Sequence, residues 1–355
     1  MTKDITVIGS GIIGSSSAWY LTKIGYRVTI IDQLVTNSSQ ENPRTGTSAS
    51  LGVLMGNIFS RNNGRAWELR KRSLSLWEIW LRELNNEKEN IKIETPLIKL
   101  AKSEKEYFSM KEMIKLKQDR DIEIISPGSY NHAIPELPVN QYGGLISHND
   151  GRINPQKLNY LFLYDALKNN LNRISAFVKT IKRGANSNSI KWSLTLSEGS
   201  TIQTDVILIS SAMNSNKLLE SLGYKINLQP VIGQGICLET ENYEWEDWPS
   251  VVNFRGFNLI PNGSNKLIIG ATIEHTNMPN INELNDMKNL NGLAPDWIKS
   301  SNIKEQWYGI RAKPTNQGAP ILKKLEEGLI VSTGHYRNGI LIAPACAEWV
   351  AKQID

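Results

Sequence analysis

The stretch ITVIGSGIIGSSSAWYLTKIGYRVTIID at residues 5–32 constrains the fold more than any other part of the chain. Apolar and β-branched residues run over 5–8 and again over 27–31, and the segment between them carries apolar side chains at helical spacing. A strand, a helix and a second strand in this order form a βαβ unit with parallel strands. This stretch therefore predicts an α/β fold.

Three glycines lie between the first strand and the helix. Gly9, Gly11 and Gly14 form G-x-G-x-x-G, and Asp32 follows the second strand. Gly9 permits a tight turn, Gly11 lets the backbone approach a pyrophosphate, and Gly14 lets the helix pack closely on the strand. Asp32 can accept hydrogen bonds from ribose hydroxyls and would repel the 2′-phosphate of NADP. The motif predicts a dinucleotide site for NAD or FAD and does not choose between them.

The chain after Asp32 departs from the usual plan of an NAD-binding domain. Such a domain adds further βαβ units, whereas here a loop rich in Ser, Asn, Gly and Pro leads into a long helical stretch at about 64–84. Residues 86–146 change to short apolar runs and Pro/Gly/Asn-rich turns, which is typical of an inserted segment. The remaining patterns predict a helix at 155–170, strands at 204–210, 228–239, 257–262, 266–274 and 328–333, and a final helix at about 344–354.

Composition narrows the class of protein. With 355 residues, 40% of them hydrophobic, the chain is large enough for two lobes. Cys237 and Cys346 lie far apart and without metal-ligand spacing, so we expect no metal site and a reducing, cytoplasmic location. No apolar run reaches the roughly 18 residues of a membrane span. The net charge of +5 is spread over a surface with interspersed acids, which disfavours a nucleic-acid partner.

Seven segments in chain order carry a resemblance to a known family. They are the opening stretch, GTSASLGVL (46–54), DGRINPQKL (150–158), LQPVIGQG (228–235), LIIGATIE (267–274), WYGIRAKPTNQGAP (307–320) and STGHYRNGILIAPA (332–345). Together they resemble the FAD-dependent D-amino-acid oxidase superfamily, nearest to its glycine oxidase and sarcosine oxidase-like members. The last segment is the most specific, because GHYRNGILIAP resembles the flavin-facing segment of glycine oxidases almost letter for letter.

The resemblance implies an α/β fold with a Rossmann-like FAD-binding lobe and an inserted α+β substrate lobe built on an antiparallel sheet. We expect residues 1–85, 147–225 and 302–355 in the FAD-binding lobe, and 86–146 and 226–301 in the substrate lobe. It also implies non-covalent FAD and the oxidative deamination of a small amino acid or secondary amine by hydride transfer to flavin N5. Electrons would pass to O2 or another acceptor, and a homo-oligomer is possible. The imine made by a true glycine oxidase would feed thiamine synthesis.

The same resemblance implies site residues. Arg311 resembles the arginine that binds the substrate carboxylate, and Arg337 resembles a second active-site arginine; a guanidinium binds a carboxylate bidentately. Asn258 stands where glycine oxidases usually carry a tyrosine near that carboxylate, so we expect it in the site with an altered specificity. Contacts to FAD are implied for Gly9, Gly11, Ile13, Gly14, Asp32, Gln33, Ser48, Gly52, Val53, Val178, Gly334, Arg337, Asn338, Gly339, Ile340 and Leu341.

Two other activities stay open on the sequence. The flavin domain of a tRNA-modifying enzyme has a similar fold and a similar GTS…GVL loop, and the pI near 9.0 allows a nucleic-acid substrate. A quinone-linked amino-acid dehydrogenase is the other alternative, and it would attach to a membrane only peripherally.

Overall fold

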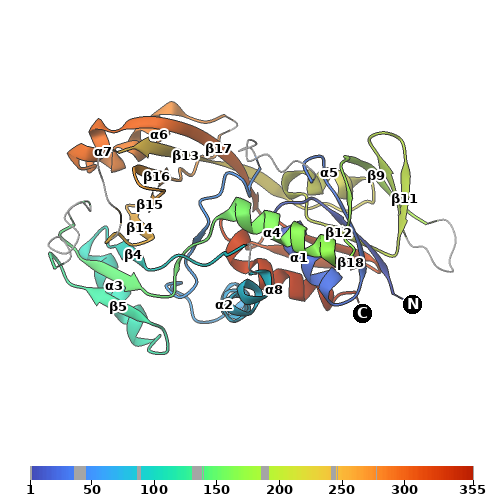
Figure 1. Cartoon of the computed structure of the whole chain (residues 1–355), viewed down its shortest axis with the longest axis horizontal. Coiled ribbons are helices and arrows are strands. Elements are labelled where there is room, and N and C mark those ends of the chain that lie inside the picture. Colours follow the sequence, from blue (N-terminus) through green and yellow to red (C-terminus); the bar gives the residue numbers. More distant parts are fainter. Residues whose placement is uncertain are drawn as a thin grey trace.

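The computed structural model describes residues 2–35, 45–85, 89–129, 138, 140–184, 192–240, 245, 247–276 and 278–354. Two large sheets hold most of the strands, and they occupy different ends of the long axis of the molecule (Figure 1). One has six strands and the other has eight. The arrangement confirms the predicted α/β class.

The six-stranded sheet contains the predicted βαβ unit. Its strand order is β18-β19-β12-β1-β2-β8, and every pair is parallel except β18 with β19. The strands are β1 (Asp4–Ile8), β2 (Arg27–Ile31), β8 (Asn172–Ile174), β12 (Val206–Ile209), β18 (Ile321–Glu326) and β19 (Leu329–Thr333). Because four of these strands run in parallel around β1, their carboxyl ends meet at one edge of the sheet.

Alternate side chains of this sheet enter two different cores. In β12, Val206 and Leu208 pack with the helices, while Ile207 and Ile209 pack with the opposite layer. That layer is a three-stranded antiparallel sheet of β9 (Val178–Arg183), β10 (Trp192–Leu196) and β11 (Thr201–Thr204). All four residues of β12 are buried, as expected for a parallel strand that is covered on both faces.

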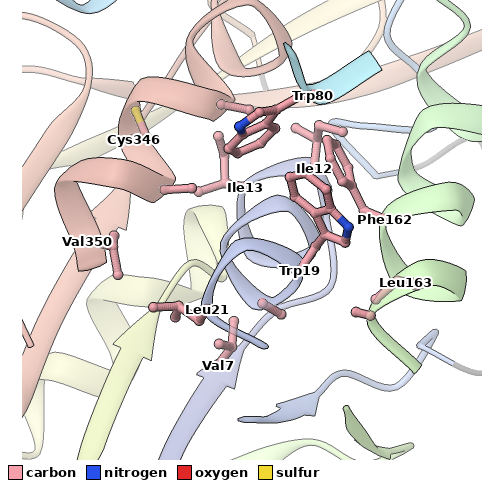
Figure 2. Packing of buried hydrophobic residues seen from close by; sticks show 14 of the residues in the cluster. Val7, Ile12, Ile13, Trp19, Leu21, Trp80, Phe162, Leu163, Cys346 and Val350 are labelled. Carbon is pink, nitrogen blue, oxygen red and sulfur yellow. The ribbon is translucent and has the colours of Figure 1, made fainter. Parts of the chain in front are cut away.

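Four helices cover the other face. They are α1 (Ile12–Lys23), α2 (Arg65–Leu84), α4 (Pro155–Lys168) and α8 (Gly339–Ala351). Figure 2 shows α1 in the middle of this layer, with Trp19, Trp80 and Phe162 meeting on one side of it. The Trp19 and Trp80 rings lie edge to face at 4.7 Å, a favoured aromatic geometry. Because α1 packs against α2, α4 and α8, the position of its first turn is set by this layer, and the glycine-rich turn before it is held in place.

The final helix begins earlier than the sequence predicted. We expected it from about Pro344, but α8 begins at Gly339 and carries Pro344 inside it. Proline has no N–H to donate and crowds the preceding turn, and α2 bonds the main-chain groups on either side of it. Ser73 Oγ accepts from the Ala345 N–H at 3.1 Å, and Trp77 Nε1 donates to the Leu341 carbonyl at 3.0 Å. The prediction was therefore wrong by one and a half turns.

The eight-stranded sheet has the order β17-β13-β16-β15-β14-β4-β6-β5. Its pairs are antiparallel except β14 with β4, so the expected antiparallel sheet is nearly right. The strands are β4 (Leu97–Leu100), β5 (Ile122–Ile125), β6 (Gly144–Ser147), β13 (Leu228–Glu239), β14 (Val251–Phe254), β15 (Phe257–Pro261), β16 (Lys266–Gly270) and β17 (Asn302–Pro314). β16 ends at Gly270, four residues before the predicted end.

One expected lobe boundary disagrees with the strand pairing. The prediction placed residues 302–355 wholly in the FAD-binding lobe, but β17 pairs along its length with β13 in the eight-stranded sheet. The chain enters the six-stranded sheet again only at β18. The reason is the length of β13 and β17, which extend from the far end of the eight-stranded sheet to the six-stranded sheet (Figure 1). The rest of the lobe division stays a prediction.

Short elements complete the described chain. They are β3 (Val53–Leu54), β7 (Gly151–Arg152), α3 (Glu104–Lys115), α5 (Ser215–Glu220), α6 (Ile281–Lys288), α7 (Asp296–Ser300) and two 3-10 turns, η2 (Ala212–Asn214) and η3 (Leu290–Gly292). Within the part of the chain that the structure describes, no helix is long and apolar enough to cross a membrane.

Candidate active site

A cavity of about 1750 Å³ lies where the two large sheets approach each other. Its walls include the residues that follow the parallel strands: Gly9 after β1, Asp32 after β2, Ser210 after β12 and Gly334 after β19. Ligands of open α/β sheets bind at the carboxyl ends of the strands, which is the edge that these residues occupy. The volume exceeds the roughly 300–1,000 Å³ of an ordinary ligand pocket, so it has room for a dinucleotide together with a substrate.

The glycine-rich turn has the geometry that its motif predicts. Gly9 has φ of 102°, a conformation that glycine adopts without strain. A Cβ on Gly14 would lie 1.8 Å from the Gly9 carbonyl oxygen, so only glycine fits where α1 crosses the turn. Gly11 is the N-cap of α1, and its side of the turn faces the cavity, as do Ile13 and Asp32. Gly14 itself lies beneath the turn and supports it.

Asp32 is tied to the turn by main-chain hydrogen bonds. Its carboxylate accepts from the Ser10 N–H at 2.8 Å and from the Leu34 N–H at 2.9 Å. Gln33 and Val178 lie away from the large cavity and line a small adjoining one of about 110 Å³, which Gly9 and Asp32 also border. The predicted ribose-binding acid and its two predicted neighbours therefore gather at one end of the site.

The loop before β3 forms the middle of the cavity. Ser48, Gly52 and Val53 line it as expected. Gly52 has φ of 75°, and a Cβ there would lie 1.8 Å from the Ile153 carbonyl oxygen, so the loop is held against the chain that leads into α4. The sequence reasoning missed Thr47, whose Oγ1 accepts from the Ile12 N–H at 2.9 Å and so joins this loop to the first turn of α1.

The start of α8 supplies the second helix N-terminus. Gly334, Asn338, Gly339, Ile340 and Leu341 all line the cavity. The Asn338 side chain makes no capping hydrogen bond to α8, so the first N–H groups of the helix are left for a ligand. A helix N-terminus attracts negative charge. The correction to the start of α8 thus places Gly339, Ile340 and Leu341, which were predicted just before the helix, in its first turn facing the cavity.

Arg311 lies on β17 and is half-buried in the cavity wall. Its Nη1 donates to the Ile232 carbonyl at 3.1 Å and to the Thr272 carbonyl at 3.0 Å. A Cβ on Gly233 would lie 2.0 Å from Nη2, so the glycine makes room for the guanidinium. Burial, aided by the charge of Arg337, lowers the pKa of Arg311 to about 10. It remains a cation at neutral pH.

Arg337 and Asn258 also reach this cavity. Arg337 is exposed, and it lies close enough to Arg311 for their charges to repel. Asn258, on β15, is 8% exposed and accepts a hydrogen bond from Asn253 Nδ2 at 2.9 Å. The structure thus brings together the three residues predicted for the substrate end, on β15, β17 and the turn before α8.

A buried carboxylate that the sequence reasoning passed over lies behind Arg311. Glu274 is 3% exposed and accepts from Gln234 Nε2 at 2.9 Å, from the Asn280 N–H at 2.8 Å and from the Thr272 hydroxyl. The Thr272 carbonyl in turn accepts from Arg311. The signal was present in the GATIE segment, where an acid follows an apolar strand.

Two further groups near α8, His335 and Cys346, are buried and uncharged at physiological pH. His335 is buried, and burial lowers its pKa to about 3, so the ring is neutral at physiological pH. Burial raises the pKa of the Cys346 thiol to about 12, and this residue lies in the helix core outside the cavity lining. A thiol of this kind is a poor nucleophile. The buried Cys346 thiol therefore gives no support to covalent attachment of a cofactor at this residue.

Comparisons with known proteins identify the family of this chain. The sequence profile of the DAO family, described as FAD dependent oxidoreductase, matches residues 4–353. Glycine oxidase of Bacillus licheniformis is 26% identical over 99% of this chain and 92% of its own length. The crystal structure of glycine oxidase from Geobacillus kaustophilus superposes with a TM-score of 0.83 at 22% identity, covering 99% of this chain and 95% of that one. L-proline dehydrogenase from P. horikoshii gives 0.81 at 21% identity, covering 99% and 93%.

Proposed function

Since this chain belongs to the DAO family of FAD-dependent oxidoreductases, we propose that it oxidatively deaminates a small amino acid or secondary amine that Arg311 holds by its carboxylate. One observation carries the proposal: a half-buried arginine, fixed by two main-chain carbonyls, shares a cavity with the N-termini of α1 and α8. The two helix ends suit the two negative regions of FAD, and the arginine suits the acid of the substrate.

The two helix N-termini have separate tasks in this proposal. The first turn of α1, with Gly9 and Gly11, would hold the pyrophosphate of FAD, and Asp32 would bind the ribose. FAD, when bound, supplies a flavin ring that accepts a hydride from the carbon next to the amine. The N–H groups of Gly339, Ile340 and Leu341 would stabilise the negative charge that the ring gains.

Arg311 would orient the substrate. Its Nη1 is already engaged by Ile232 and Thr272, so the remaining N–H groups of the guanidinium are the ones left for a carboxylate. Such a contact fixes the α-carbon relative to the ring, which is the main service that a flavoenzyme gives its substrate. Arg337, exposed at the same cavity, would add a second positive charge for the acid.

No side chain of this site is needed as a general base. A neutral amine loses its α-hydrogen as a hydride and becomes a protonated imine, which water then hydrolyses to a carbonyl compound and an ammonium ion. His335 is neutral because it is buried, and a neutral imidazole can accept a proton. The hydride transfer proposed here does not require one. The role that we assign to His335 is to pack the turn before α8.

The proposal also covers the cellular location, the electron acceptor and the fate of the product. We place it in the cytoplasm, in support of which both cysteines are free and buried. The electron acceptor would be O2 or another oxidant. If glycine is the substrate, the imine would serve thiamine synthesis, and loss of the protein would then create a thiamine requirement that added thiazole relieves.

The test is the anaerobic bleaching of the bound flavin. The purified protein is mixed in turn with glycine, sarcosine, D-amino acids, L-amino acids and proline, and the oxidised flavin absorption band is followed. Bleaching by an amino acid, with a half-saturating concentration that rises about 10- to 100-fold in Arg311→Ala, supports the proposal. A bound flavin that none of these compounds bleaches overturns it and favours the tRNA-modifying alternative.

A further inference from the structure

A second buried arginine lines the cavity, and the proposed reaction leaves it without a task. Arg70 lies in the middle of α2 and is only 7% exposed. Its neighbours on the buried stripe of the helix include Trp67, Ser73 and Trp77, so an arginine interrupts a face that packs against the protein. An isolated cation in such a place is costly unless something pairs with it.

The partners of Arg70 within the described residues are few and uncharged. Its Nη1 donates to the Ala66 carbonyl at 2.7 Å, and the guanidinium stacks over the Phe59 ring with its central carbon 3.8 Å from the ring centroid. Nε is buried without a hydrogen-bond partner. No carboxylate in the described part of the chain forms an ion pair with it. Burial and the charge of Arg61 lower its pKa.

The surroundings add positive rather than negative charge. Lys117 is buried, donates to the carbonyls of Asn57 and Phe59, and lies over the Trp67 ring. The nearby buried acid, Asp150, is already engaged at both oxygens, by the N–H groups that hold the loop at 56–58 and by the Ser147 hydroxyl. It has no geometry left for Arg70. No acid among the described residues supplies the missing negative charge, and Arg70 lines the cavity, where a bound molecule can reach it.

We propose that Arg70 binds a second anionic group of the substrate, so that the natural substrate is an amino acid with two carboxylates. Arg311, on β17, would hold the carboxylate next to the amine, and Arg70, on α2, would hold the other from a different wall of the cavity. This inference rests on the proposed function. It adds to that function a requirement on substrate charge, because glycine and sarcosine have nothing for Arg70 to bind.

The test uses inert acids, so that binding is separated from oxidation. Acetate, malonate and succinate are titrated into the FAD-loaded protein, and the shift of the flavin absorption spectrum gives each Kd. In the wild-type protein we expect malonate or succinate to bind about tenfold or more tightly than acetate. Arg70→Gln should abolish that preference and leave the Kd of acetate unchanged, and Arg70→Lys should restore part of it.

Arg82→Gln is the matched control, because Arg82 lies on the same helix, is exposed and pairs with Glu78. It should change no Kd. Equal Kd values for acetate and both dicarboxylates in the wild type overturn the inference, even if Arg70→Gln fails to fold. A preference that survives in Arg70→Gln also overturns it. Loss of FAD from Arg70→Gln would instead assign Arg70 to the cofactor.

The outcomes also separate this inference from the proposed function. Glycine that bleaches the flavin, together with equal Kd values for mono- and dicarboxylates, would leave the proposed function intact and refute the role of Arg70. A flavin that no amino acid bleaches, together with no binding of acetate, would refute both. Both proposals are supported if kcat/KM is higher for aspartate or iminodiacetate than for glycine and if this preference disappears in Arg70→Gln.

Discussion

The two ends of the cavity differ in the groups that face a ligand: main-chain groups at one end and side chains at the other. At the nucleotide end, the groups that would contact a ligand are main-chain N–H groups of α1 and α8. Gly9, Gly14 and Gly52 allow this backbone path, because a Cβ at any of them would collide with main-chain atoms. At the substrate end, the groups that would contact a ligand are side chains from β15, β17 and the turn before α8. The first end needs a particular backbone path, whereas the second needs several distant segments to meet.

This difference predicts which substitutions remove the cofactor and which remove only the substrate. Changes at the nucleotide end distort the main chain and should act on FAD binding. Changes at the substrate end move the tips of side chains and should leave FAD in place.

The largest effect is expected from Gly14→Ala. The new Cβ would lie 1.8 Å from the Gly9 carbonyl oxygen, which is main chain and cannot swing away. We expect FAD affinity to fall about 5- to 150-fold, because overpacking of this kind costs about 1–3 kcal/mol. Flavin retained after gel filtration measures it. Gly318→Ala, at an open position with no atom near its Cβ, is the control and should keep its flavin.

A substrate-end effect with the cofactor retained is expected from Gly233→Ala. Here the Cβ would lie 2.0 Å from Arg311 Nη2, the end of a flexible side chain, so the guanidinium moves and the main chain stays. We expect KM for the amino acid to rise about 10- to 100-fold, the range for losing hydrogen bonds to a charged group. Steady-state kinetics on flavin-loaded protein measure it. A loss of FAD equal to that of Gly14→Ala would break the division between the two ends.

The same division explains how much the sequence could predict. The nucleotide end follows from local chain geometry, so Gly9, Gly11, Gly14 and Asp32 could be read from spacing alone. The start of α8 could not, because the main-chain groups on either side of Pro344 are bonded by Ser73 and Trp77 of a helix about 270 residues away in the chain.

The substrate end was predicted only in part. Resemblance placed Arg311, Arg337 and Asn258, but Gly233 acts through a strand pairing that no local pattern encodes. Arg70 left one trace in the sequence, a charged residue in the stripe of Trp67, Ser73 and Trp77 that the helical period buries. A charge in such a stripe is a signal worth testing, but only the structure shows that Arg70 also lines the cavity.

A smaller effect is expected from Glu274→Gln, which sharpens the description of the substrate end. Glu274 touches no cavity atom and acts through Thr272, so it is a positioning residue for Arg311. The amide has one acceptor oxygen where the carboxylate has two, so one of its three donors loses a partner. We expect the Kd of acetate to rise about 3- to 10-fold with FAD retained.

The exposed Glu283→Gln on α6 is the control for that substitution, and it should bind acetate like the wild type. An unchanged Kd of acetate in Glu274→Gln, measured by the flavin spectrum, would show that the Glu274 cluster supports the sheet and not the arginine.

The smallest effect is a pH dependence of carboxylate binding. Burial and the charge of Arg337 lower the pKa of Arg311 to about 10, so the guanidinium is charged below that pH and neutral above it. Acetate carries no amine and stays ionised, so its Kd should be constant between pH 7 and 9 and should have risen about twofold at pH 10. Because lysine has a lower intrinsic pKa, Arg311→Lys should move the rise to lower pH. A flat profile to pH 11 in both proteins would mean that acetate binds elsewhere, and an inflection between pH 5 and 8 would contradict the neutral state of His335.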